Sequence, residues 1–97
     1  MASSREAFLK FDKWKNSRTV LNLTVVNIVD DECFEDRFQG AIFFADEDDE
    51  ILGFVDDESR NSVTLDLSGG SFAMDARSVE VKCPDRGTVT FAEVLLV

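Results

Sequence analysis

The chain has 97 residues, of which 44% are apolar, and its 20 acidic and 10 basic residues give a net charge of −10. This length is enough for one domain with one modest hydrophobic core, and the high apolar content with a single proline excludes a disordered chain. The negative charge opposes nonspecific binding to nucleic-acid phosphates and to anionic membranes, so a polyanionic partner would need a local basic patch.

We expect a cytoplasmic protein with no membrane partner. The first residues lack the basic and apolar segments of an export signal, and no stretch reaches the roughly 18 apolar residues that a membrane span needs. Cys33 and Cys83 are isolated in the sequence, which suits reduced thiols in that compartment and does not indicate a disulfide.

The N-terminal segment differs in charge from the rest of the chain. Residues 1–18 hold five basic and two acidic side chains, net +3, whereas residues 19–97 are net −13. We expect the basic face of this segment to dock on the acidic body or on another copy of the chain. The alternative is a contact strip for an anionic ligand.

The same segment is predicted to be helical. Ser3 and Glu6 fit a capping box, and apolar side chains follow at three- and four-residue spacings, which predicts a helix over about residues 4–15. A hairpin that turns at residues 16–17 stays open as the alternative, because the Phe-Leu-Lys-Phe segment also suits a strand.

Strands are predicted over the remainder of the chain. The first is β-branched and shifts its apolar phase from Val25 to Val26, as a bulged or sharply bent strand would. The second and third are apolar on both faces and flank an acidic turn, and the fifth shifts phase near residues 75–78. The predicted strands cover residues 19–29, 37–45, 51–56, 62–68, 71–82 and 88–97.

These elements predict a mainly β fold, a small and strongly bent antiparallel β-barrel that is partly open and preceded by an N-terminal α-helix, as a single domain over residues 1–97. Residues 38–45 and 89–97 are apolar on both faces, and one helix covers only part of that surface. The uncovered surface and the sheet edges therefore predict a homo-oligomer.

The side chains available for catalysis favour a protein that is not an enzyme and has no cofactor. The absence of histidine removes Ser-His and Cys-His nucleophile pairs and histidine metal sites, and two lone cysteines cannot form a zinc site. The sequence has no Gly-rich loop of the kind that cradles phosphate, and no carboxylate pair is singled out by its spacing.

The acidic turn has part of the residue spacing of a calcium loop. Asp46, Asp48 and Glu50 occupy its first, third and fifth positions and Asp57 its twelfth, but the sixth position is Ile51. A calcium loop needs glycine there and a bidentate Glu at its end, so the sequence predicts no metal site.

The second strand carries a family resemblance. Its apolar-x-Gly-x-apolar segment, followed by a hydrophobic residue and Asp, resembles the first motif of the Sm and Sm-like family of small β-barrels, which have a short helix and five bent strands. The matching residues are Phe38, Gly40, Ile42, Ala45 and Asp46, and Glu50 stands where the family has Asn.

The second motif of that family, apolar-Arg-Gly-x-x-apolar, is similar to residues 74–79. Here Asp75 replaces the Arg and Ala76 the Gly, and Arg77 follows. The resemblance covers about residues 4–81, and a strand near residues 63–67 and a tail strand after Gly87 exceed the family's plan.

The resemblance implies a ring of protomers joined by strand pairing, with RNA bases held by the loops of the two motifs. The base-stacking position falls on Asp48, the base-contacting Asn on Glu50 and the Arg on Asp75. Because three carboxylates repel phosphate, the usual RNA pocket is expected to be changed or lost.

Two functions of a non-enzymatic binding module stay open. In the first, a ring face binds single-stranded RNA through basic side chains of the N-terminal segment, namely Lys10, Lys13, Lys15 and Arg18. In the second, the acidic body engages a basic protein partner or mimics a polyanion.

Overall fold

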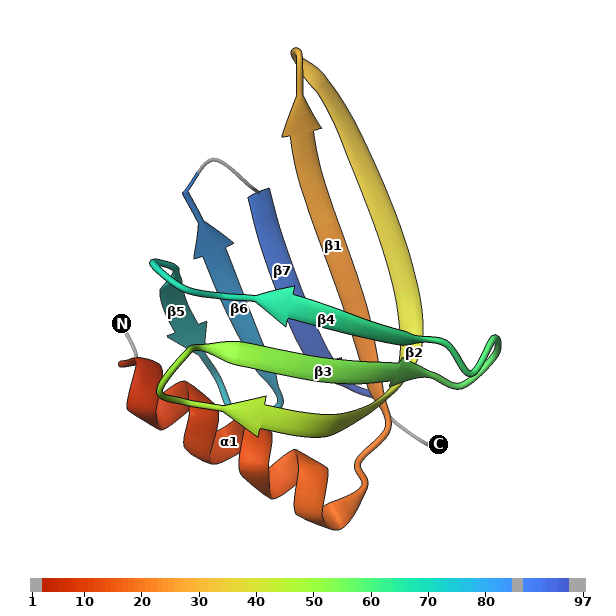
Figure 1. Ribbon diagram of the computed structural model, residues 1–97, viewed down its shortest axis with the longest axis vertical. Coiled ribbons are helices and arrows are strands. Elements are labelled where there is room, and N and C mark those ends of the chain that lie inside the picture. Colours follow the sequence, from red (N-terminus) through yellow and green to blue (C-terminus); the bar gives the residue numbers. More distant parts are fainter. Residues whose placement is uncertain (1–2, 85–86, 95–97) are drawn as a thin grey trace.

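The computed structural model describes residues 3–84 and 87–94, with the backbone alone for Ile28 and Val29. Within these residues, one helix precedes seven antiparallel strands that form a single sheet in the order β4-β3-β2-β1-β7-β6-β5 (Figure 1). The mainly β fold with an N-terminal helix is confirmed. The elements are α1 (Ser4–Ser17), β1 (Leu21–Val29), β2 (Glu32–Asp46), β3 (Ile51–Asp56), β4 (Ser62–Asp66), β5 (Ser71–Met74), β6 (Ser78–Cys83) and β7 (Gly87–Glu93).

Helix α1 begins at the capping box. The backbone N–H of Glu6 donates to Ser3 Oγ at 3.2 Å, and the Glu6 carboxylate accepts from the Ser3 backbone N–H. The helix ends at Ser17, and Arg18 caps it in the left-handed conformation with φ 53°. The alternative hairpin at residues 16–17 is therefore wrong, because capping and burial of one apolar face stabilise the helix.

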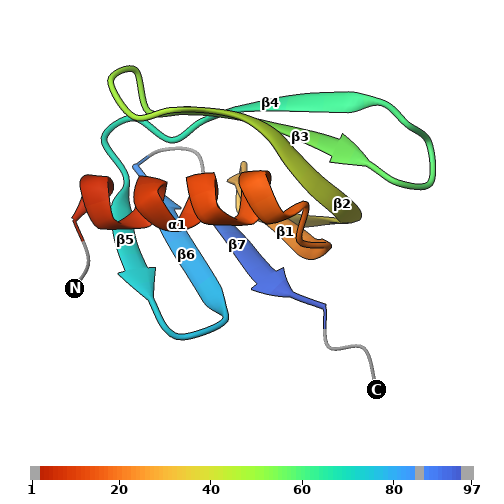
Figure 2. The ribbon, with the colours of Figure 1, turned by 90° about the horizontal axis from the view of Figure 1, so that it is seen from below.

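Helix α1 covers one open end of the bent sheet with its buried face. Figure 2 shows α1 between the layer of β2–β4 and the layer of β1 and β5–β7. The Phe11 ring lies 5.0 Å from the Phe91 ring of β7, and the Phe8 ring lies 6.3 Å from Phe72 of β5, centroid to centroid. The fully buried core residues with the largest side chains are Phe8, Phe11, Phe54, Phe91, Leu21, Leu23, Leu52, Leu67, Val79 and Val81.

Strand pairing does not close the sheet into the predicted barrel. Among the described residues, β4 and β5 are the two edges of the sheet. The Leu67 N–H donates to the Glu50 carbonyl at 2.8 Å and the Gly70 N–H donates to the Leu67 carbonyl at 3.1 Å. The chain therefore turns away from β4 before β5 begins.

The predicted bulge lies in a different strand. β1 pairs with β2 in one regular register from Leu21 to Val29, and the register shift falls in β2, between Ile42 and Phe44. The change of apolar phase at Val26 arises because this side chain is half-buried on the opposite face of β1 from Val25.

The predicted strand over residues 71–82 is two strands, β5 and β6, which pair as a hairpin. Asp75 Oδ1 accepts from the Arg77 N–H at 2.8 Å, and the Asp75 N–H donates to the Ser78 carbonyl at 3.0 Å. These bonds close a tight turn, so the phase shift in the sequence marks a chain reversal. The predicted final strand over 88–97 appears as β7 to Glu93, and its last three residues lie outside the described residues.

The β1–β2 hairpin extends past the body of the sheet (Figure 1). β1 pairs with β7 as far as Val26 but with β2 as far as Val29, and β2 begins at Glu32 rather than at the predicted residue 37. Asp30 and Asp31 form its turn with φ 51° and 65°, as in a type I′ turn. We call residues 27–37 the arm.

The base of the arm lies against the start of β7. Gly87 there has φ 109°, and a Cβ on it would lie 1.9 Å from the carbonyl oxygen of Val26. The close approach therefore requires glycine.

Candidate functional site

Two of the four basic side chains predicted to bind nucleic acid make contacts within the protein. Lys10 Nζ donates to the carbonyl oxygen of Ala76 at 2.8 Å and lies 5.2 Å from the centroid of the Trp14 ring. Lys15 Nζ lies 3.7 Å from Asp12 Oδ1 on the same helix. Two of the four predicted cations are thus engaged within the protein.

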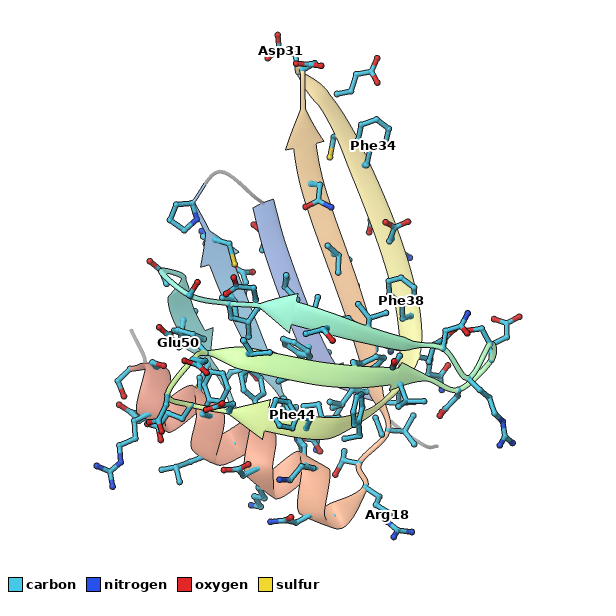
Figure 3. All side chains as sticks on the ribbon, in the orientation of Figure 1. Arg18, Asp31, Phe34, Phe38, Phe44 and Glu50 are labelled. Carbon is cyan, nitrogen blue, oxygen red and sulfur yellow. The ribbon has the colours of Figure 1, made fainter. Side chains whose placement is uncertain are left out.

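Lys13 and Arg18 are exposed. Arg18 lies at the C-terminal end of α1, beyond the last helical turn (Figure 3). Their positive charge is available to an anionic ligand.

The first Sm-like loop position is the β2–β3 turn. Asp46 Oδ1 accepts from the backbone N–H groups of Asp48 at 3.0 Å and Asp49 at 3.4 Å. Glu50 adopts φ 54°, and its Oε2 accepts from Ser4 Oγ at 3.0 Å. The turn is therefore tied to the N-terminal end of α1, where the helix dipole favours a carboxylate.

The second Sm-like loop position is the β5–β6 turn of Asp75, Ala76 and Arg77. The Arg77 N–H holds the pKa of Asp75 below its ordinary value of 3.8, with the Ser78 side chain and the nearby Lys10 charge acting in the same direction. Both loop positions thus contact α1, one through Ser4 and the other through Lys10. Their carboxylates accept hydrogen bonds from the chain itself.

The described residues contain no group of three or more Cys, Asp or Glu side chains placed to hold a metal ion. In the same part of the chain, no helix has the length and apolar character needed to cross a bilayer.

The free edge of β2 on the arm was missed by the sequence prediction. In the described part of the chain, residues 32–38 have β1 as their one strand neighbour, whereas β3 pairs with β2 from Gly40 to Asp46. The Asp57 N–H donates to the Gln39 carbonyl at 2.8 Å, so the backbone groups of Gln39 face the β3 side.

This orientation fixes which backbone groups of the arm face outward. Strand residues alternate the side to which their N–H and C=O groups point. The backbone groups of Gln39 point to the β3 side. The N–H and C=O groups of Cys33, Glu35 and Arg37 therefore point to the same side, where the described residues hold no strand. The edge therefore presents a row of backbone donors and acceptors to an incoming chain.

The side chains around this edge carry mainly negative charge. Residues 30–37 hold five carboxylates and one cation, Arg37. Arg37 Nε lies 2.9 Å from the Glu35 carboxylate, and the other four carboxylates have no described ion pair. At the base of the arm, the β3–β4 turn adds residues 56–58. A hydrogen bond from the Ser59 hydroxyl is the main cause of the lowered pKa of Asp56, which keeps that carboxylate ionised.

Two hollows flank the base of the edge, with volumes of about 400 and 430 Å³. Both are lined by Arg37, Phe38, Gln39 and Glu58; the first extends to residues 22–24 of β1 and the second to Asp56 and Asp57. Side chains of an added segment could enter these hollows next to carboxylates.

Phe34 and Phe38 belong to the same face of β2 (Figure 3), because residues two apart in a strand share a face. Phe38 packs against the core, which makes this the concave face, and Phe34 is 50% exposed farther along the arm. The two-residue spacing Phe34, Asp36, Phe38 is the signal in the sequence that could have revealed this extension of the strand. The run of acids around it suggested a loop instead.

Comparisons with known proteins do not assign the chain to a family. No protein-family model, no curated protein and no solved structure matches it. The Sm-like resemblance therefore rests on the motif residues alone.

Proposed function

We propose that the protein is a non-enzymatic binding module that engages a basic segment of a partner protein through the acidic arm. The observation that carries this proposal is that negatively charged side chains surround an accessible strand edge. Five carboxylates in residues 30–37 and three in residues 56–58 surround the edge of β2 and its two hollows. A complementary positive segment would be steered to this surface.

Exposed charges alone give weak binding. Each exposed ion pair contributes about 0.2–1 kcal/mol, so five such pairs supply on the order of 1–5 kcal/mol, which corresponds to a Kd of about 0.2 mM at best. The arm charges therefore select the sign of the partner and accelerate its association. Additional contacts must supply the remaining affinity.

The second proposal follows from the Sm-like resemblance, in which a ring of protomers binds single-stranded RNA. Lys13 and Arg18 are exposed on α1 and favour it, because they would attract phosphate. The internal contacts of Lys10 and Lys15 reduce the charge available, so the geometry supports the acidic arm better.

The test compares two variants that each lose five carboxylates. One carries Asp30→Asn, Asp31→Asn, Glu32→Gln, Glu35→Gln and Asp36→Asn on the arm; the control carries Asp46→Asn, Glu47→Gln, Asp48→Asn, Asp49→Asn and Glu50→Gln in the β2–β3 turn. Binding of a blocked lysine-rich heptapeptide is followed by changes in backbone amide NMR signals at low and high salt.

We expect the peptide to shift signals of the arm and of residues 56–58, with affinity that falls as salt rises. The arm variant should lose most of this binding, and the control should keep it. Equal loss in both variants would show that net charge alone attracts the peptide, and the proposal would then fail.

A further inference from the structure

We infer that the partner segment binds as an added antiparallel β-strand along the free edge of β2, an inference that rests on the proposed function. The edge over residues 32–38 is about 23 Å long at the usual strand rise, which accommodates a bound segment of about seven residues. Its outward backbone groups belong to Cys33, Glu35 and Arg37. An added strand would satisfy these groups with regular ladder hydrogen bonds.

The charge of the edge decides which strands can pair with it. Exposed edges invite pairing with other chains, and proteins commonly block them with lysine, proline or a bulge. Residues 32–36 contain neither lysine nor proline, and the register between β1 and β2 is regular there.

Like charges placed opposite one another across a strand pair are destabilising. An antiparallel pair of two such edges would bring carboxylates of both copies together, with Glu35 opposite its own counterpart in one register and Glu32 opposite Asp36 in another. The edge therefore opposes its own copy and favours a strand that carries positive charge.

The two faces of the arm predict the pattern of the bound strand. On the outer face, Glu35 and Arg37 pair with each other at 2.9 Å, so a neighbouring side chain there meets little net charge. On the concave face, Phe34 offers an exposed ring and Asp36 a carboxylate. The partner should place an apolar side chain opposite Phe34 and a basic one opposite Asp36.

A second basic side chain fits at the base of the edge. The hollow of about 430 Å³ places Phe38 beside Asp56, Asp57 and Glu58. A lysine or arginine can lay its aliphatic stem along an aromatic ring while its charged end reaches carboxylates. Read from its N-terminal end, the predicted segment thus has a basic side chain opposite Phe38, a second basic one opposite Asp36 and an apolar one opposite Phe34. These three side chains occupy every second position of the segment.

The probe is the blocked heptapeptide Ser-Lys-Ser-Lys-Ser-Val-Ser. In antiparallel pairing its lysine and valine side chains lie on the concave face, and its serines carry the backbone N–H groups that point to β2. One version is N-methylated at the second and third serines, which removes donors from the ladder. The matched control is N-methylated at the two lysines, whose N–H groups point away.

Methylation of the serines should weaken binding at least tenfold, whereas methylation of the lysines should change it less than threefold. When the unmodified peptide occupies about nine-tenths of the sites, amide hydrogen exchange of Cys33, Glu35 and Arg37 should slow about tenfold. The N–H groups of their neighbours Phe34 and Asp36 point to β1, so the exchange rates of these two amides should change less.

The outcomes separate this inference from the proposed function. If both methylated peptides bind equally well and the arm variant binds neither, the acidic arm binds the peptide without strand pairing, and the inference is overturned. If no version binds, or if binding is unaffected by the loss of the arm carboxylates, the proposed function fails with it.

Discussion

Lys10 Nζ donates a hydrogen bond to the carbonyl oxygen of Ala76 at 2.8 Å and thereby joins α1 to the β5–β6 turn. The same ammonium group lies over the Trp14 ring, and its charge contributes to the lowered pKa of Asp75. A side chain that the sequence predicts as a nucleic-acid contact is therefore a link between the helix and the sheet.

Replacement of this link should lower stability. We expect Lys10→Met to reduce the free energy of unfolding by about 1–2 kcal/mol, because a charge-assisted hydrogen bond and a cation–π contact are lost. Lys13→Met, which removes an exposed lysine from the same helix, should change it by less than about 0.5 kcal/mol. Urea denaturation measures both, and equal midpoints for the two variants would contradict the role given to Lys10.

RNA binding provides the test between the two proposed functions. If α1 binds single-stranded RNA, the contact is electrostatic, and replacing Lys10, Lys13 and Lys15 together with Glu should abolish it. Glu50→Asn with Asp75→Arg should strengthen it, since these changes restore the contact types of the Sm-like motifs. Fluorescence anisotropy with labelled oligonucleotides at low salt measures the affinity.

Absence of RNA binding by the original protein would leave the acidic arm as the better proposal. Binding that survives the lysine reversal would instead show that the two loops hold the RNA despite their carboxylates.

Acid should destabilise the fold partly through Asp56 and Asp75. The Ser59 hydroxyl lowers the pKa of Asp56 and the Arg77 N–H lowers that of Asp75, both below the ordinary 3.8. Each carboxylate therefore contributes stability that is present above about pH 4 and is lost as the pH falls through the folded-state pKa.

We expect the Asp56→Asn, Asp75→Asn double variant to lose less stability than the original protein between about pH 5 and about pH 2.5. Asp57→Asn, at an exposed neighbouring position, is the control. Urea midpoints measured across this range test the effect, and parallel pH profiles for the original protein and the double variant would count against it.

Self-association should depend on the outer face of β2. Phe43 and Phe44 are 52% and 46% exposed there, and the ring of Phe43 lies against Gly53 of β3. Adjacent exposed aromatic side chains favour burial between copies. We expect light scattering to show an oligomer that Phe44→Ser dissociates and that Leu9→Ser, at an exposed position on α1, leaves intact.

A mass of 10.9 kDa at high micromolar concentration would mean that the protein is a monomer and that this face stays exposed.

Local signals in the sequence account well for the helix and for the general class of the fold. The capping box at Ser3 and Glu6 acts between residues three apart, and the same contacts form in the structure. The sequence prediction was wrong where pairing between strands determines the structure of a segment. The acids of residues 30–36 suggest a loop, yet residues 32–36 belong to β2, because they pair with the β-branched residues of β1.

The candidate site was predictable in its charge but not in its location. Sequence composition shows an acidic body, whereas the position of the free edge depends on where β3 leaves β2 near Gln39. Residues 46–50 were predicted as a turn and residues 75–77 as part of a strand, whereas both are turns in the structure. The hydrogen bond from the Arg77 N–H to Asp75 is local, but the bond from Ser4 to Glu50 joins residues 46 apart and depends on the fold.

The close approach of Gly87 to Val26 determines where the two-stranded arm separates from the seven-stranded sheet. Any larger residue at position 87 would displace the first residues of β7 from the base of the hairpin. It would not change any carboxylate of the arm. The direction and reach of the arm could therefore change independently of its charge, through a residue outside the binding edge.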